Sequence, residues 1–172
     1  TIERKQAAKR VSNERPIEIF FNGQPMVVSQ GTPNHLSELA VGYLLSEGFL
    51  TDRAKFRSVR SDRHTAQVEV FSDEQPSKKI KVAHRYTGGG CPESALWTQS
   101  SEFLSQIKTQ RTFAAEDLVC MMDELCERSP LRNDGECVHG CGIGTNGVLA
   151  CVREDIGRHN AMDKLIGQAW LD

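Results

Sequence analysis

Residues 153–164 read Arg-Glu-Asp-Ile-Gly-Arg-His-Asn-Ala-Met-Asp-Lys, and this polar stretch joins a segment typical of a strand to a segment typical of a helix. The strand is expected over Val148–Val152, and the helix is expected to begin at Asp155. The buried side of this helix is expected to hold the apolar residues at helical spacing, namely Ile156, Leu165, Ile166, Ala169 and Trp170. The stretch therefore marks a strand-to-helix junction crowded with titratable groups.

Acidic and imidazole side chains recur every four residues at this junction. Asp155 precedes His159 by four residues, and His159 precedes Asp163 by four, so each pair is expected to share a helix face. A carboxylate in that position would orient the histidine and set its tautomer. Gly157, in the first turn, would let a backbone or a ligand approach closely. A solvated, ion-paired helix start explains the same pattern equally well.

A turn signal and a cluster of potential metal ligands lie just upstream. Asn-Gly at 146–147, between two apolar runs, predicts a β-hairpin. Cys137, His139 and Cys141 alternate along its first strand, so their side chains are expected on one face. Zinc uses cysteine and histidine at such short spacing, but no second matched pair follows, and small strand cysteines beside a functional histidine are the alternative. Cys151 is interpreted as a packing residue of the second strand.

The rest of the chain alternates between strand-like and helix-like segments, which indicates a mixed α/β or α+β fold. Asn22-Gly23 is a hairpin signal, and Gly48 ends a helix for which Asn34 is a suitable N-cap. Strands are expected over Pro16–Phe21, Met26–Ser29, Phe56–Val59, Ala66–Phe71, Lys79–Ala83 and Val138–Ile143, helices after Thr32, after Pro92 and over Ala115–Arg128, and a loop over Arg132–Glu136.

The helix over Ala115–Arg128 is amphipathic in sequence. Its apolar residues are expected to face the core, namely Leu118, Met122, Leu125 and Cys126. Cys120 and Cys126 are accordingly interpreted as packing residues of this helix, because reduced cysteine behaves as a small apolar side chain.

Cys91 is the cysteine best placed for chemistry. It follows three glycines at 88–90 and precedes Pro92, which suits the first turn of a helix. A thiol at a helix N-terminus is favoured as the thiolate, and His84 and Arg85 add positive charge nearby. An activated thiol on a glycine loop is what sulfur or acyl transfer needs, and a cysteine that merely caps the helix is the alternative.

Composition narrows the class of protein. The 172 residues carry 21 Lys and Arg against 23 Asp and Glu, a net charge of −2, which disfavours generic binding to nucleic acid or to anionic membranes. The clearest apolar run, Leu39–Leu45, is far too short to span a bilayer. No secretory signal is visible, so we expect a cytoplasmic protein whose six cysteines are reduced.

We expect three parts along the chain. Residues 1–13 are expected to form a mobile N-terminal lead-in, residues 14–85 a small β-rich section with one helix, and residues 86–172 the core. Because the last residues still follow an apolar helical pattern, the core is expected to be truncated at its C-terminus.

The polar junction and two upstream segments resemble a known family. Residues 154–167, Glu-Asp-Ile-Gly-Arg-His-Asn-Ala-Met-Asp-Lys-Leu-Ile-Gly, resemble the signature of the FdhD/NarQ family of formate dehydrogenase accessory proteins. Residues 14–23 and 32–48 are similar to the N-terminal section of that family, and Val138-His139 followed by a hairpin also fits. The match covers most of residues 14–167 in the right order.

The resemblance implies a sulfurtransferase that acts in maturation of the molybdenum cofactor. Sulfur would pass from a cysteine desulfurase to a loop cysteine as a persulfide, and then to the molybdenum or tungsten cofactor before its insertion into formate dehydrogenase. The family fold implies a three-layer core similar to cytidine deaminase, preceded here by the β-rich section. The implied partners are the desulfurase, the catalytic subunit of formate dehydrogenase and a second copy in a homodimer.

The resemblance also implies the site residues. The loop cysteine corresponds to Cys91, and because Ser94 stands where many members have a second cysteine, we expect a persulfide on one thiol. The bound substrate would be molybdopterin guanine dinucleotide (Mo-bis-MGD), with no permanent metal. The residues expected to bind it are His139, Asp155, Gly157, Arg158, His159, Asn160, Asp163 and Lys164.

Two other functions fit parts of the pattern. A non-catalytic chaperone would bind the cofactor or formate dehydrogenase without thiol chemistry. A zinc hydrolase of the deaminase type would need H-x-E and P-C-x-x-C motifs, whereas Cys141 stands two residues after His139 and Ser94 three residues after Cys91. The sequence therefore favours the sulfur carrier.

Overall fold

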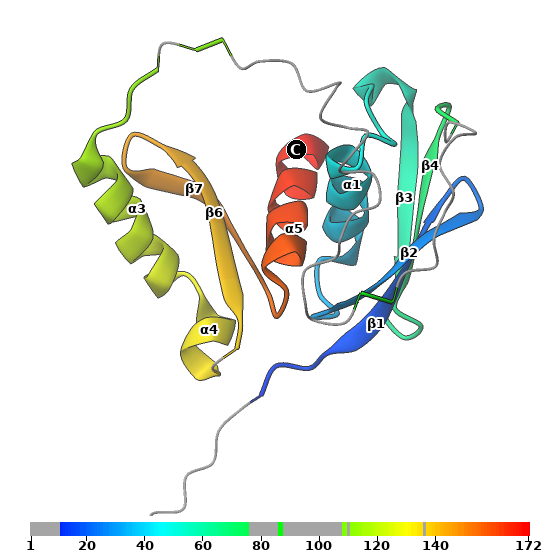
Figure 1. The fold of residues 1–172 in the computed structure, drawn as a ribbon, viewed down its shortest axis with the longest axis horizontal. Helices are drawn as coiled ribbons and strands as arrows, with labels where there is room; N and C mark the ends of the chain where they lie inside the picture. Colours follow the sequence, from blue (N-terminus) through cyan, green and yellow to red (C-terminus); the bar gives the residue numbers. More distant parts are fainter. Residues whose placement is uncertain (1–10, 76–85, 88–107, 110, 136) are drawn as a thin grey trace, which may run out of the picture.

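The computed structural model describes residues 11–75, 86–87, 108–109, 111–135 and 137–172. A five-stranded sheet in the order β3-β4-β1-β2-β5 forms one side of the molecule (Figure 1). Its strands are β1 (Arg15–Phe21), β2 (Gln24–Gly31), β3 (Phe56–Asp62), β4 (Gln67–Ser72) and β5 (Tyr86–Thr87). A short 3-10 turn, η1 (Arg53–Lys55), leads into β3.

The hairpin of β1 and β2 is the centre of this sheet. Asn22 and Gly23 form its turn with φ of 50° and 77°, the left-handed conformation that a tight two-residue hairpin requires. Alternation along β1 buries Ile17, Ile19 and Phe21 on one face. The predicted hairpin is confirmed, and its inner face holds the main apolar core.

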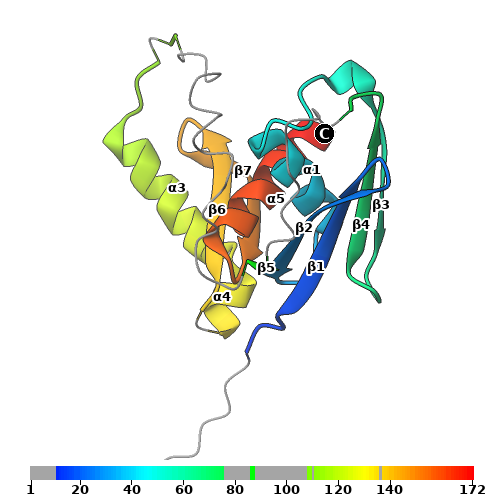
Figure 2. The same ribbon diagram turned by 45° about the vertical axis from the view of Figure 1, so that its right-hand side comes forward.

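Helix α1 (Leu36–Ser46) covers the inner face of the sheet and packs against helix α5 (Arg158–Leu171) (Figures 1 and 2). Its end at Gly48 is confirmed, because Gly48 has a φ of 73° and donates its backbone N–H to the Leu45 carbonyl. Its predicted beginning is wrong, because His35 is the N-cap and makes no side-chain cap bond. Asn34 instead turns its amide oxygen toward Lys164.

A second, two-stranded sheet lies on the other side of α5. Strands β6 (His139–Thr145) and β7 (Val148–Asp155) form the predicted hairpin, and α3 (Ala115–Glu127) and α4 (Pro130–Asp134) follow its outer side (Figure 1). The layers run from the five-stranded sheet through α1 and α5 to the hairpin and α3 (Figure 2). The mixed α/β class is thus confirmed.

Three local predictions are wrong. The expected loop over Arg132–Glu136 gives way to α4, because the Glu154 carboxylate accepts hydrogen bonds from the N–H groups of Leu131 and Arg132 at its start. Helix α5 begins at Arg158 with Gly157 as its N-cap, and Asp155 ends β7. The expected set of buried residues in the last helix is also wrong in part, since Ala169 is exposed. Lys164, which was not expected on the buried side, is buried.

The expected inward face of α3 is wrong except at Leu125. Leu125 is the only residue of α3 that is buried, whereas Leu118 and Met122 are exposed. Cys120 and Cys126 are exposed rather than packed in the core. The helix therefore presents apolar surface away from the body of the protein.

The expected division at residue 85 stays a prediction. Contacts join the two sides of that point, since α1 packs on α5 and β5 pairs with β2. Residues 1–10 of the expected lead-in and the expected strand Lys79–Ala83 lie outside the described residues. Within the described ranges, no helix combines the length and apolarity that a bilayer crossing requires.

Helices α1 and α5 touch backbone to backbone because glycine lies at the contact. A Cβ atom on Gly42 would lie 1.8 Å from the Asp163 carbonyl oxygen, and one on Gly167 would lie 1.9 Å from the Glu38 carbonyl oxygen. Side chains larger than hydrogen at these two positions would force the helices apart.

Gly42→Ala should destabilise the fold by about 3 kcal/mol or more, the upper range for overpacking, since the new methyl group meets backbone that cannot rotate away. Urea denaturation followed by circular dichroism measures the change. Met162→Ala, at an exposed position of α5, is the control and should shift stability by less than about 0.5 kcal/mol. An alanine variant as stable as the wild type would contradict the close helix contact.

Asp163 should make stability depend on pH. Burial, with a smaller contribution from the nearby Glu47 charge, raises the pKa of its carboxyl to about 7 against the opposing hydrogen bond from Ser46. The unfolded chain ionises this group near pH ~3.9, so stability falls as pH rises from about 4 to about 7.

Asp163→Asn should therefore stabilise the fold by about 1–2 kcal/mol at pH 7 and above, and should change little near pH 4. Unfolding free energies measured across this pH range test it, with the exposed Asp123→Asn as control. A benefit that is equal at both ends of the range would show that ionisation of Asp163 is not its cause.

Candidate functional site

A buried ion pair lies where β7 passes into α5. The Lys164 ammonium lies 2.6 Å from Oδ2 of Asp155, and neither side chain has any exposed surface. Burial lowers the pKa of Lys164, and the Asp155 charge opposes this effect. A charge pair removed from water in this way is stable only if its remaining hydrogen-bonding capacity is satisfied.

Lys164 satisfies its N–H groups with oxygens of the loop before α1. Nζ donates to the Thr32 carbonyl at 3.0 Å and to Oδ1 of Asn34 at 2.6 Å, and the Glu154 carbonyl lies at 3.3 Å. A single side chain of α5 therefore ties the end of β7 to the β2–α1 connection, more than 120 residues earlier.

Asp155 satisfies its carboxylate with two backbone N–H groups and one side-chain amide from the same two regions. Oδ2 accepts the Thr32 N–H at 3.0 Å, while Oδ1 accepts the Gly157 N–H at 2.8 Å and the Asn160 amide at 3.2 Å. The Ile156 N–H donates to Oγ1 of Thr32 at 3.3 Å. Asp155 thus fixes the turn into α5 as well as the neighbouring loop.

Asn160 extends this network to strand β2. Its amide nitrogen donates to the Gln30 carbonyl at 2.8 Å, and its oxygen accepts the Ser29 hydroxyl at 3.0 Å. A Cβ atom on Gly31 would lie 2.7 Å from this amide nitrogen, so glycine makes room for it. We call the six side chains and their bonds the junction network: Ser29, Thr32, Asn34, Asp155, Asn160 and Lys164.

The junction network lies beside the sheet edge from which the chain runs toward Cys91. Ser29, which binds Asn160, is the register partner of Thr87 in β5. Cys91 itself lies outside the described residues, four positions after Thr87. The network therefore holds strand β2, with which β5 pairs.

A second, less buried pair joins β7 to α1. The Arg153 guanidinium binds the Glu38 carboxylate with two nitrogens, one at 3.0 Å. Burial alone would raise the pKa of Glu38, but hydrogen bonds and charge from His35 and Arg153 outweigh it and bring the pKa to about 2. Arg153 also contacts the Cys151 sulfur at 3.2 Å, and burial raises the pKa of that thiol.

The structure divides the predicted cofactor residues into two groups. Asp155 and Lys164 are fully buried, and Asn160 is half-buried with its amide bound. His139, Arg158 and His159 are exposed around the start of α5. The two remaining residues are half-buried, with Gly157 as the N-cap of α5 and Asp163 bound to Ser46 between the helices. The exposed residues can contact a ligand. The buried residues hold in position the start of α5, around which the exposed residues lie.

Of the two expected helix-face pairs, His159 and Asp163 lie four residues apart within α5, whereas the other pair is wrong. Asp155 and His159 share no helix face, because Gly157 separates strand from helix.

The three possible metal ligands do not share one strand face. Cys137 lies before β6 with a φ of 81°, so the expected three-residue face reduces to His139 and Cys141. Among the described residues, no group of three histidine, cysteine or acidic side chains could hold a metal ion.

Sequence reasoning missed the N-terminal half of the junction network. Ser29, Thr32 and Asn34 carry side chains that are common at strand ends and helix caps, and nothing local links them to a lysine 130 residues away. Their one signal is the polar run after the β2 pattern, which the sequence interpretation assigned to helix capping.

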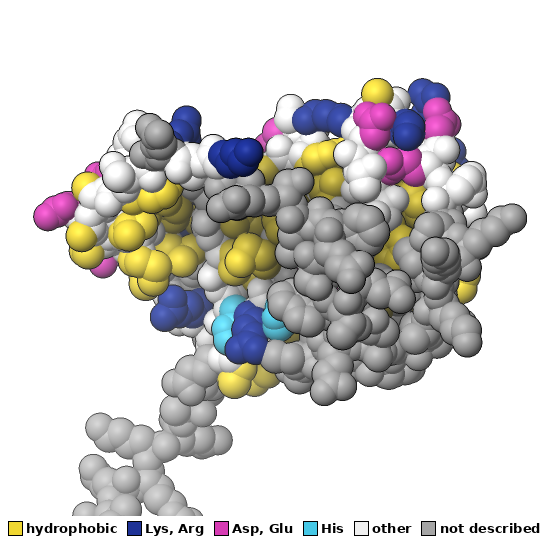
Figure 3. All heavy atoms as spheres, turned by 45° about the horizontal axis from the view of Figure 1, so that its top comes forward, with side chains coloured by type: hydrophobic (Ala, Val, Ile, Leu, Met, Phe, Trp, Pro, Cys, Tyr) yellow, Lys and Arg dark blue, Asp and Glu magenta, His cyan; other side chains and the backbone are white. Residues whose placement is uncertain are grey.

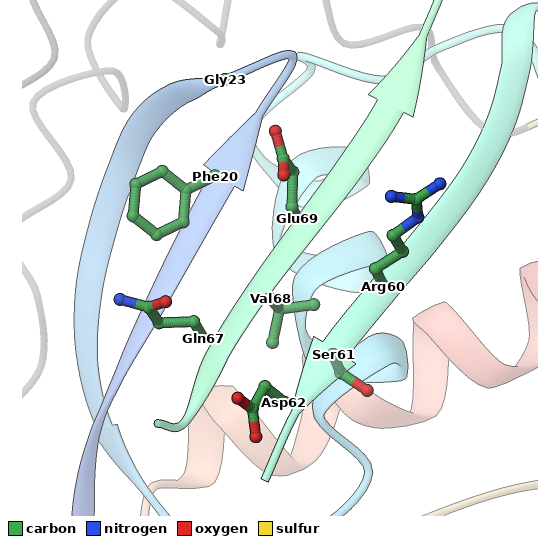
Figure 4. Close-up of a pocket in the computed structure, with 8 residues that line it drawn as sticks. All are labelled: Phe20, Gly23, Arg60, Ser61, Asp62, Gln67, Val68 and Glu69. Atoms are coloured by element: carbon green, nitrogen blue, oxygen red, sulfur yellow. The ribbon is translucent and has the colours of Figure 1, made fainter. Parts of the chain in front are cut away.

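A shallow depression on the outer face of the five-stranded sheet is remote from these residues. Figure 4 shows its lining from β1, β3 and β4, with Phe20, Gln67 and Glu69 on the side opposite α1. Because none of the predicted site residues that the structure describes line it, it is not a candidate for the site.

Comparison with known proteins gives a consistent result. A model of the FdhD/NarQ family matches residues 12–172. The sulfur carrier protein of Geobacillus kaustophilus (strain HTA426) is 32% identical over 91% of this chain and 61% of its own length. The corresponding protein of Bacillus pumilus (strain SAFR-032) is 31% identical over 94% and 63%.

A solved structure agrees with these matches. The crystal structure of a protein described as a formate dehydrogenase accessory protein, from Desulfotalea psychrophila, superposes with a TM-score of 0.73 at 26% identity. The superposition covers 95% of this chain and 60% of the chain in the crystal structure. The chain thus spans about three fifths of the length of the curated relatives it matches.

Lys164→Met should destabilise the fold by about 3–5 kcal/mol, because Asp155 would remain buried without its cation. Chemical denaturation measures the loss. Lys55→Met removes an exposed lysine 3.9 Å from Asp52 and should cost less than about 0.5 kcal/mol.

The double variant Asp155→Asn/Lys164→Met should regain part of the stability lost in Lys164→Met, because it leaves no unpaired buried charge. If Lys164→Met and Lys55→Met cost the same, the buried pair would not hold the junction.

Proposed function

The chain belongs to the FdhD/NarQ family, and on this basis we propose that it is a sulfur carrier required for formate dehydrogenase activity. It would accept sulfur from a cysteine desulfurase as a persulfide on Cys91 and deliver it to the molybdenum cofactor. Relatives named sulfur carrier proteins and the likeness to a formate dehydrogenase accessory protein support the proposal.

One structural observation carries this proposal. The junction network fixes β2 at Ser29, β5 pairs there through Thr87, and Cys91 follows four residues later. Four peptide units span at most about 14 Å, so the length of chain between Thr87 and Cys91 tethers the thiol to the end of β5. Such tethering favours transfer between two sites because it limits the search for the acceptor.

The sulfur step needs little beyond access and a thiolate. The Cys91 sulfur attacks the terminal sulfur of the donor persulfide, a new S–S bond forms on Cys91, and the S–S bond of the donor breaks. The donor cysteine leaves as a thiolate and takes the proton released by the Cys91 thiol. The persulfide on Cys91 then carries the sulfur to the cofactor, whose metal centre is the substrate.

The residues expected to bind the cofactor then have two roles. His139, Arg158 and His159 lie around the N-terminus of α5, where a guanidinium, imidazole groups and backbone N–H groups suit an anionic pterin dinucleotide. Asp155, Asn160 and Lys164 position that helix start through the junction network. Their contribution to binding would be indirect.

The proposed partners follow from this role. A cysteine desulfurase supplies the sulfur, the catalytic subunit of formate dehydrogenase receives the cofactor, and a second copy of the chain completes a homodimer in the cytoplasm. A molybdopterin guanine dinucleotide is the proposed cargo.

Incubation with cysteine desulfurase and cysteine should add one sulfur atom to Cys91, detected by mass spectrometry of the intact protein and of its peptides. Cys91→Ser should abolish the adduct and reduce formate dehydrogenase activity in cells to background. Cys120→Ser, which removes an exposed thiol on α3, should leave both unchanged.

The same variants separate the carrier from a chaperone without thiol chemistry. A chaperone would tolerate Cys91→Ser and lose activity when the residues around Cys91 are deleted. Full formate dehydrogenase activity with Cys91→Ser would therefore refute the persulfide role.

A further inference from the structure

The outer face of α3 presents apolar side chains to solvent. Leu118, Val119 and Met122 are 51%, 60% and 55% exposed, and Phe113, just before the helix, is 70% exposed. Figure 3 shows hydrophobic side chains gathered on the left of the molecule, where α3 lies in Figure 1. Single exposed apolar residues are ordinary, but a group on one element marks an interaction surface.

These side chains form a continuous stripe along the helix. At 100° per residue, Leu118, Val119 and Met122 fall on one face together with Ala115 and Cys126, which are also exposed. The opposite face, which includes Glu124 and the half-buried Met121, packs toward the β6–β7 hairpin. The amphipathic pattern of α3 is therefore directed outward.

An acidic row borders the stripe on one side. Glu116, Asp123 and Glu127 follow one another at i, i+7 and i+11, so they align along a single flank, and all three are exposed. Arg128, at the end of the helix, binds Glu124 at 2.7 Å and the Leu149 carbonyl at 2.6 Å, and Arg132 contacts the Cys126 sulfur at 3.7 Å. In the described part of the chain, no ion pair neutralises the row.

This charge pattern distinguishes between possible occupants. Two copies of α3 packed antiparallel about a twofold axis would place both acidic rows on the same flank, where like charges repel. A parallel twofold pairing would direct each row to the flank that bears Leu125, which already packs on the hairpin. A partner with positive charge along one edge of an apolar stripe meets the row favourably.

We propose that the outer face of α3 is a docking surface for an amphipathic helix of a partner protein that carries Lys or Arg along one edge of its apolar stripe. Leu118, Val119 and Met122 supply the apolar contact, and Glu116, Asp123 and Glu127 set orientation and selectivity. This surface lies on the far side of the hairpin from α5, and the proposal does not rest on the sulfur chemistry.

The test uses two synthetic helical peptides with the same leucine stripe. One peptide carries lysines along one edge and the other carries glutamates at the same positions. Fluorescence anisotropy with the whole chain should show the lysine peptide bound at least about tenfold more tightly, with affinity falling as salt rises.

Variants at exposed positions locate the binding. Leu118→Asp should weaken the lysine peptide at least about tenfold, whereas Met162→Asp, equally exposed on α5, should not. The triple variant Glu116→Gln/Asp123→Asn/Glu127→Gln should erase the preference for lysine. Neutralising Glu14, Glu18 and Glu69 removes the same number of charges elsewhere and should preserve it.

Three results would overturn the proposal. Equal affinity for the two peptides would remove the role of the acidic row. Equal loss in both triple variants would show attraction to net charge alone. A concentration-dependent dimer of the chain that Leu118→Asp dissociates in sedimentation velocity would assign the face to a second copy.

Discussion

The ion pair of Asp155 and Lys164 is the constraint on which the rest of the site depends. Two opposite charges with no exposed surface are tolerated because nearly every neighbouring donor and acceptor is backbone or amide. Thr32 both donates its N–H to the carboxylate and lends its carbonyl to the ammonium, so the pair fits one arrangement of the loop before α1. Moving that loop would leave a buried charge without its partner.

This constraint joins two halves that are distant in sequence. The first hairpin and α1 come from the N-terminal part, and the second hairpin and α5 come from the C-terminal part. Close contact of α1 and α5 at Gly42 brings the halves together, and the junction network sets their register at one end. Most of the polar residues at 154–164 thus hold the two halves of the fold together. His139, Arg158 and His159 remain exposed at the surface.

Much of the fold could be predicted where local chemistry decides the conformation. Asn22-Gly23 and Gly48 impose turns and a helix end that few other residues allow, and the structure has them there. The direction in which a helix faces is a different matter, because the spacing of Leu118 and Met122 shows that they share a face but not that the face is buried. Helix α4 was missed because its cap, Glu154, comes from a strand more than twenty residues later.

The site shows the same limit. The sequence marks residues 154–164 as one unit, yet the separation into exposed and buried members depends on partners such as Asn34, far away in the chain. The hydrogen-bond partner of each polar group is set by tertiary structure, and local sequence propensity does not predict it.

Native-state hydrogen exchange tests the central claim most directly. The backbone N–H groups of Thr32 and Gly157 both donate to Asp155, so they report whether the junction opens by itself. We expect both to exchange only through global unfolding, with the same free energy as chemical denaturation gives. Rapid exchange of either amide, at a rate close to that of an exposed turn such as Asn146-Gly147, would contradict the account.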